Sequence, residues 1–188
     1  MKLARQQWRD GQSELSPEQL IFIDESGLST NMARLRGWSP EGERCVAAVP
    51  HGHWKTVTFI GGLTSSGFIA PMLLDQAMDG EWFLAWVEQQ LAPLLKPGQI
   101  VIMDNLPAHK IAGARLAIEA RGAKFLFLPA YSPDLNPIEN AFAKLKSYVR
   151  KTAARTFDAL HVAVADALAT FSSAECRNFF KHAGYGSI

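Results

Sequence analysis

Cysteine is scarce in this chain of 188 residues, and the two cysteines present, Cys45 and Cys176, lie far apart. They match no metal-binding or redox spacing, so we expect a reduced, cytosolic setting. Long apolar runs are missing too: none approaches the roughly 18 residues that a membrane-spanning helix needs, so no membrane partner is expected. Residues 1–19 are polar, and we expect no secretory signal there.

A large excess of charge of either sign is also missing, because the net charge is +1. Such a balance neither requires nor excludes a nucleic-acid partner. Basic residues nevertheless gather in one stretch of the sequence, at Lys144, Lys146, Arg150, Lys151 and Arg155. A run of this kind is often only a solvated helix face, and a nucleic-acid surface is the alternative.

The remaining composition, 48% hydrophobic and 20% charged, is typical of a globular domain with a sizeable core. Apolar runs rich in β-branched and aromatic residues predict strands, and 3.6-residue periodicity predicts helices. The expected strands are 20–23, 54–63, 68–74, 100–103 and 125–128, and the expected helices are 81–95, 109–119, 137–151, 156–171 and 174–183. This order predicts an α/β domain with a mixed sheet over residues 20–155. We interpret residues 1–19 as a tail or the remnant of an upstream region, and 156–188 as a helical extension packed on the same domain.

Two acids share one sequence context. Asp24 and Asp104 each follow four apolar residues, and ligand sites in α/β proteins gather at the carboxyl ends of such strands. A third acid, Glu139, lies on the first turn of a helix that Pro137 is suited to begin, with Asn136 as its expected N-cap.

Three carboxylates brought together repel one another unless cations bind, so a pair of Mg²⁺ or Mn²⁺ ions fits this set. Two such ions stabilise the attacking and leaving oxygens of phosphoryl transfer. Alternatively, Asp24 and Asp104 only end strands and cap turns, and Glu139 only completes a capping box with Asn136.

The residues around these acids resemble the catalytic domain of DDE transposases, in particular the bacterial IS630 relatives of the Tc1/mariner group. The resemblance rests on Ile23-Asp24-Glu25-Ser26, on Met103-Asp104-Asn105-Leu106-Pro107-Ala108-His109, and on the segment from Pro129 to Glu139. Moreover, 34 residues separate Asp104 from Glu139, the spacing that characterises this group. The resemblance covers about residues 18–155 and implies an RNase H-like fold, a mixed five-stranded sheet flanked by helices. It also implies that Asp24, Asp104 and Glu139 are the catalytic metal ligands.

The resemblance further implies cleavage at transposon ends, followed by attack of the freed 3′-OH on target DNA. It implies double-stranded DNA as the partner, a homodimer in the DNA complex, two metal ions per site when DNA is bound, and a bacterial, nucleoid-associated protein. The chain departs from the family at its front, because nothing there supplies the helix-turn-helix module that reads transposon ends. We expect that module to be encoded separately or to have been removed.

Four residues are predicted to contact DNA. Steps of 100° place Lys146 and Arg150 on the Glu139 side of the helix, where they are suited to hold phosphates. Asn105 and His109 follow Asp104 closely, and His109 either touches the scissile phosphate or caps its helix. Two other functions stay open: an RNase H-like nuclease without strand transfer, and a non-catalytic DNA-binding relic of a transposase.

Overall fold

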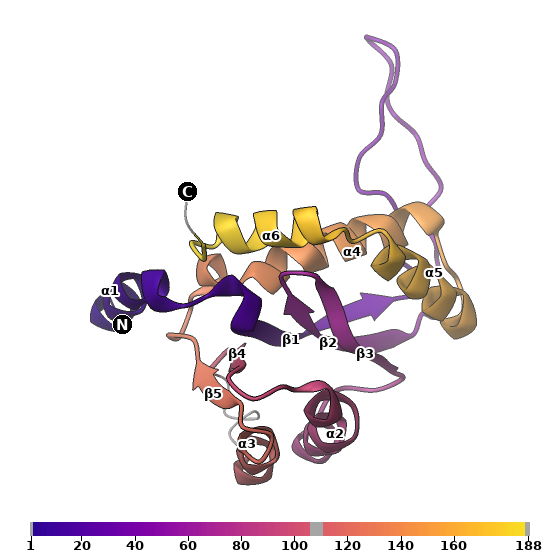
Figure 1. The fold of residues 1–188 in the computed structure, drawn as a ribbon. Helices are drawn as coiled ribbons and strands as arrows, with labels where there is room; N and C mark the ends of the chain where they lie inside the picture. Colours follow the sequence, from indigo (N-terminus) through magenta and orange to yellow (C-terminus); the bar gives the residue numbers. More distant parts are fainter. Residues whose placement is uncertain (1, 106–110, 187–188) are drawn as a thin grey trace.

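The computed structural model describes residues 2–105 and 111–186, with the remaining residues drawn in grey in Figure 1. The strands are β1 (Leu20–Ser29), β2 (Thr56–Thr64), β3 (Gly67–Leu74), β4 (Ile100–Met103) and β5 (Lys124–Phe127). The helices are α1 (Lys2–Gly11), α2 (Gly80–Trp86), α3 (Ala112–Glu119), α4 (Pro137–Thr152), α5 (Phe157–Ala169) and α6 (Ser173–His182).

The strands form one mixed sheet in the order β3-β2-β1-β4-β5. The hairpin strands β2 and β3 pair antiparallel with each other, and β2 pairs antiparallel with β1. On the other side of β1, strands β4 and β5 run parallel to it, each reached through a helix. This is the RNase H-like arrangement that the sequence predicts.

Helices cover both faces of the sheet (Figure 1), with α4, α5 and α6 on one face and α2 and α3 on the other. Alternate side chains of β1 divide between the two faces, as the pleat of a strand requires. Phe22 packs with the α4 side, whereas Ile21 and Ile23 pack with the α2 side. Residues 20–23 are all apolar because both faces of this central strand are buried.

Several expected boundaries differ from the structure. Strand β1 does not end at Asp24 but continues to Ser29, because its second half pairs with β2. The helix expected over 81–95 is an α-helix only to Trp86, followed by a π-helical turn and a 3₁₀ turn that contains Pro93. Proline lacks the N–H of the regular α-helical bond, so the α-helical pattern cannot pass through it unchanged.

Pro71 lies in the edge strand β3, a position where a proline removes no bond from the centre of the sheet. The pairing of β2 with β3 shifts register between Ile60 and Gly62, and Ala70 and Pro71 lie on β3 opposite this shift.

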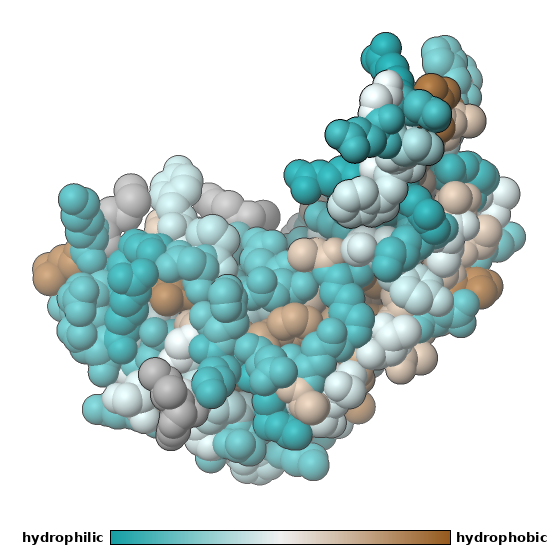
Figure 2. Space-filling model, turned by 90° about the horizontal axis from the view of Figure 1, so that it is seen from above, coloured by the Kyte–Doolittle hydropathy of each residue, from teal (hydrophilic) through white to brown (hydrophobic). Residues whose placement is uncertain are grey.

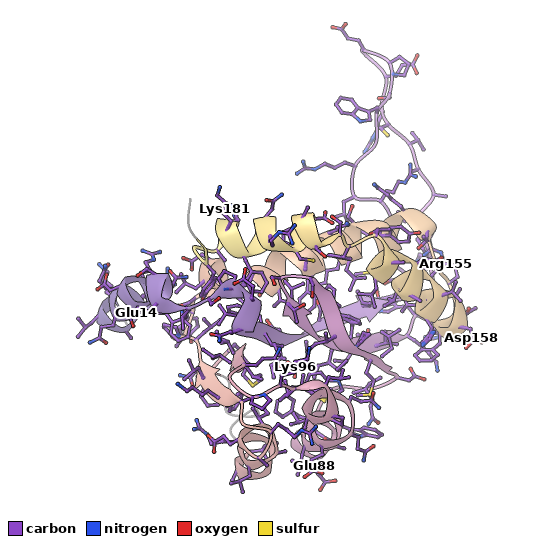
Figure 3. The ribbon with its side chains drawn as sticks, in the orientation of Figure 1. Glu14, Glu88, Lys96, Arg155, Asp158 and Lys181 are labelled. Carbon is purple, nitrogen blue, oxygen red and sulfur yellow. The ribbon has the colours of Figure 1, made fainter. Side chains whose placement is uncertain are left out.

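A long irregular segment, 31–55, projects from the body between β1 and β2 (Figure 1). Two carbonyl groups at its base, those of Thr30 and Met32, accept hydrogen bonds of 3.0 and 2.8 Å from Arg155, which is labelled in Figure 3. Figure 2 shows a mostly hydrophilic face with scattered apolar residues. None of the helices in the described part of the chain is long and apolar enough to cross a membrane.

Candidate active site

Asp24 lies on the face of β1 that is directed toward helix α4. It follows Phe22 by two residues, and Phe22 packs in the core cluster that contains α4. In the parallel pairing of β1 with β4, Phe22 lies opposite Ile102. Asp24 lies two residues beyond Phe22, and Asp104 lies two residues beyond Ile102, just after the end of β4. The same register therefore brings Asp24 level with Asp104. The two acids therefore meet because of a strand register.

Glu139 reaches the same region from the first turn of helix α4. The helix begins at Pro137, as expected, and its apolar side is buried against the sheet. Phe142, Leu145 and Val149, spaced as one apolar stripe of an amphipathic helix, are all buried. Glu139 itself is exposed beside this stripe, and a negative charge is favourable at the amino end of a helix.

Asp24, Asp104 and Glu139 line one pocket of about 400 Å³. The other lining residues are Asn105, Leu128, Pro129, Ala130, Tyr131, Ser132, Pro133 and Asn136. The pocket thus lies between the carboxyl end of β4, the middle of β1 and the loop that leads into α4. The acids that the sequence singles out do share one site.

The electrostatics of the pocket are unfavourable for a third negative charge. Burial raises the pKa of the Asp24 carboxyl from 3.8 to about 7, although a hydrogen bond from the Glu25 backbone N–H acts in the opposite direction. The negative charges of Glu25, Asp104 and Glu139 raise this pKa further. Among the described residues, no positive charge offsets these effects on Asp24, and a bound cation would supply one.

Asn136 is a member of the site that the sequence reasoning missed. Its side-chain N–H donates to Asp24 Oδ2 over 3.0 Å, while the Glu25 N–H donates to Asp24 Oδ1 over 2.8 Å. Each oxygen of the Asp24 carboxylate thus accepts one bond from the protein, which fixes the orientation of the group.

The alternative reading, a capping box between Asn136 and Glu139, is not what the described residues form. Asn136 is the N-cap by backbone position, but within the described part of the chain its side chain makes no capping bond. The amide is 3% exposed, and its Oδ1 has no hydrogen-bond partner among the described residues. The amide nitrogen is bonded to Asp24, and the amide oxygen, which would be the capping acceptor, is not bonded to a helix N–H group. The sequence pattern at Asn136 indicates a cap and gives no sign of the bond to Asp24.

The donor set of the pocket suits a hard divalent cation. Carboxylate and amide oxygens are the ligands that Mg²⁺ and Mn²⁺ prefer, and the buried Oδ1 of Asn136 is an acceptor to which no described residue donates. Among residues 2–105 and 111–186, no three acidic, histidine or cysteine side chains are close enough together to hold an ion as they stand. The chemistry of the pocket fits a metal, and the ligand role of the three acids stays a prediction.

The residues predicted to contact DNA lie in different places. Lys146 and Arg150 are half-buried on the side of α4 that carries Glu139, roughly 10 and 16 Å further along the helix axis. Asn105 is exposed at the pocket edge, and His109 lies outside the described residues.

Two other members of the basic run serve the structure. Lys144 donates to the Thr170 carbonyl, pairs with Glu175 and lies over the Phe171 ring, and Arg155 holds the base of segment 31–55. These contacts leave Lys146, Arg150 and Lys151 as the members of the run suited to an external partner.

The model of the DDE superfamily endonuclease family matches residues 19–161. Among solved structures, the fold is similar to the Mos1 transposase in its paired-end complex with the left transposon end (TM-score 0.75, 19% identity), over 96% of this chain and 56% of that chain. The Mos1 strand transfer complex is similar with a TM-score of 0.72 and 19% identity, over 97% of this chain and 56% of that one. The catalytic domain of Mos1 mariner transposase is similar with a TM-score of 0.64 and 16% identity, over 97% of this chain and 84% of that one. No curated protein matches the sequence.

Proposed function

Because this chain belongs to the DDE superfamily endonuclease family, we propose that it is the catalytic core of a transposase of the IS630 and Tc1/mariner kind. It would cut phosphodiester bonds at transposon ends and join the freed 3′-OH to target DNA. The observation that carries this proposal is the convergence of Asp24, Asp104 and Glu139 on one pocket. The fold shared with the Mos1 complexes supports it, although this chain spans only 56% of the Mos1 chain in those complexes.

Asp24, Asp104 and Glu139 would hold divalent cations. The Mos1 paired-end complexes with Mn and with Mg support this choice of ion. Two bound ions would supply charge stabilisation to the attacking and leaving oxygens of the phosphodiester. Asn136 keeps the Asp24 carboxylate in a fixed orientation. Such preorganisation lowers the cost of assembling charge around the reacting phosphate.

DNA would approach along α4. Lys146 and Arg150 would hold phosphates along the DNA that leads to the cut, which makes binding dependent on salt but not on sequence. Asn105 lines the pocket and would contact the DNA near the scissile bond. The role of His109 stays a prediction for a residue outside the described part of the chain.

The wider assembly is proposed on the same basis. Paired transposon ends require two copies of the core, so we expect a homodimer on DNA, and an upstream helix-turn-helix module for reading the ends. Residues 20–155 would form the catalytic domain, 1–19 a tail or the remnant of an upstream region, and 156–188 a helical extension. The resemblance to the IS630 group, together with a DNA substrate, supports a bacterial, nucleoid-associated location.

A nicking assay tests the proposal. Supercoiled plasmid is incubated with the protein in Mg²⁺ or Mn²⁺, beside Asp104→Ala and the matched control Asp166→Ala, an exposed acid on α5. We expect metal-dependent nicking by the wild type and the control, and none by Asp104→Ala. Pre-cut transposon ends then distinguish strand transfer from a nuclease that only cleaves. If the wild type binds plasmid but does not nick it in either metal, the non-catalytic relic is the better description.

A further inference from the structure

Helix α1 lies against the outer side of the loop that carries the active-site residues. Figure 1 shows it at the edge of the molecule, beside the chain that links β5 to α4. The Arg5 guanidinium donates to both carboxylate oxygens of Asp134, over 2.9 and 2.8 Å, and to the Tyr131 carbonyl over 3.1 Å. One turn further, Arg9 donates to the same carboxylate of Asp134 over 3.1 Å. Asp134 is separated from Asn136 by a single residue.

A second contact holds the same loop through the end of the chain. The Trp8 indole N–H donates to the Tyr185 hydroxyl over 2.9 Å, and that hydroxyl donates to the Leu135 carbonyl over 2.9 Å. Tyr185 is 1% exposed, and burial raises its pKa to about 12, so the hydroxyl keeps its proton. Gln12, just after the helix, donates to the Ala183 carbonyl beside this tyrosine.

These polar contacts attach α1 to the loop, and its half-buried Trp8 also packs against the core cluster that contains α4. None of its residues, Lys2–Gly11, all of them described, is buried. Its side chains instead reach the loop 131–136 directly, or reach Tyr185, which holds that loop. A helix present only to complete the core would bury an apolar face. The arrangement of α1 is that of a support for one loop.

The loop needs such support. Tyr131 has a φ of +56°, a left-handed conformation that is unfavourable for a residue with a side chain. Its carbonyl is one of the groups that Arg5 holds. Asn136 follows Asp134 by two residues, and Glu139 follows it by five. A loop released at Tyr131 and Asp134 would lose its fixed position relative to Asp24.

We propose that α1 is a brace that positions the catalytic site, with Arg5 as the positioning residue and Asp134 as its partner on the loop. The brace fixes the backbone of residues 131–136 and thereby holds Asn136 and Glu139 against Asp24. Its catalytic consequence rests on the proposed function of the pocket, whereas its effect on the loop does not.

An isolated exposed ion pair contributes little, so the geometry matters here. The Arg5 side chain is 23% exposed, its guanidinium engages a carboxylate with two parallel bonds, and a third bond goes to a backbone carbonyl. Bidentate pairs of this kind are the strong and directional ones. The Lys55–Asp75 pair, at 2.8 Å with side chains 63% and 48% exposed, is a matched pair outside the site.

Hydrogen exchange tests the brace without reference to activity. In the full chain, we expect Arg5→Ala and Asp134→Ala each to speed exchange of the segment 130–140 severalfold, while the β4 and β5 segments are unchanged. Lys55→Ala should leave segment 130–140 at the wild-type rate. Equal rates in all four proteins would overturn the proposal.

Manganese binding tests the consequence for the site. By calorimetry at a temperature where every variant is folded, we expect Arg5→Ala to bind Mn²⁺ about tenfold more weakly, the usual cost of losing a residue that orients a ligand. Asp134→Ala should show a similar loss, and the double variant should lose less than the sum of the two single losses, because both variants remove the Arg5–Asp134 pair. Lys55→Ala should bind as the wild type does.

Unchanged Mn²⁺ affinity in Arg5→Ala, or full additivity in the double variant, would overturn the positioning role. If the wild type itself bound no Mn²⁺, the proposed function of the pocket would fail. The exchange rates would still decide whether α1 holds the loop. Arg5→Lys provides a final check: a lysine cannot make the two parallel bonds, so it should restore only part of the affinity.

Discussion

Replacing Asp24 with asparagine should change how the stability of the metal-free protein depends on pH. The pKa of Asp24 rises from 3.8 to about 7 in the folded state, chiefly through burial. Between these two values the folded protein holds a proton that the unfolded chain has released. The free energy of unfolding therefore falls as the pH rises through this window, and it is constant with respect to this group above it.

The size of the effect follows from the shift. About 3 pH units, at about 1.4 kcal/mol each, correspond to at most about 4 kcal/mol between pH 4 and pH 7. A domain of this kind is stable by roughly 5–15 kcal/mol, so such a loss is easily measured. Asparagine at position 24 keeps the shape of the group but carries no charge at any pH, so the variant should lack this loss.

Urea unfolding of both proteins at pH 5 and at pH 8, in the presence of a chelator, measures the difference. Relative to the wild type, we expect Asp24→Asn to be more stable by roughly 1–2 kcal/mol at pH 5 and by about 4 kcal/mol at pH 8, so the gap should widen with pH. Adding Mn²⁺ at pH 8 should stabilise the wild type and not the variant, because binding to the folded state alone raises stability. Parallel pH curves for the two proteins would refute the reasoning.

Three further changes are predicted to act on separate parts of the molecule. Asn136→Ala removes the hydrogen bond that the side-chain amide donates to Asp24. It should lower the free energy of unfolding by about 2 kcal/mol at pH 8, where the acceptor is charged, and by less at pH 5, where Asp24 is protonated. Equal losses at both pH values would contradict the assigned bond. The ring of Phe142 fills a core position, with its centroid 5.9 Å from that of Phe59, so Phe142→Ala leaves a cavity. It should lower the free energy of unfolding in urea by about 3–5 kcal/mol. The control Val162→Ala, at an exposed position, should lower it by less than about 0.5 kcal/mol. Lys146→Ala should reduce the slope of log affinity against log salt for duplex DNA by about 1. The control Lys181→Ala, on helix α6 (Figure 3), should leave this slope unchanged. The same slope in both variants would exclude Lys146 as a phosphate contact.

The strands and the sharing of one pocket by the three acids were predictable because their signals are local. Four apolar residues before Asp24 and before Asp104 mark strands buried on both faces, and the structure has strands there. The end of β1 was not predictable in the same way. Its second half, from Glu25 to Ser29, is held by antiparallel pairing with β2, more than 25 positions away, and its own residues give little strand signal.

The partners of the site residues were harder to predict than the residues themselves. Asn136 lies before a helix and matches a cap, so the local rule assigned it there. Its actual partner, Asp24, is 112 positions away, and nothing in the local pattern favours that bond over a capping bond. Arg5 is similar, since the polar segment 1–19 gives no sign of a partner 129 positions away. Long-range polar pairs depend on the completed fold, which periodicity does not encode.

The contacts of the loop before helix α4 explain in physical terms why this segment needs a particular side chain at each successive position. Asp134 is directed outward to α1, whereas Asn136 is directed inward to Asp24. Between them, the Leu135 side chain is 3% exposed and its carbonyl accepts the Tyr185 hydroxyl. Pro137 then begins the helix that carries Glu139. Successive residues thus serve the brace, the core, the acid and the helix, so a substitution at any one of them should disturb the others through a shared backbone.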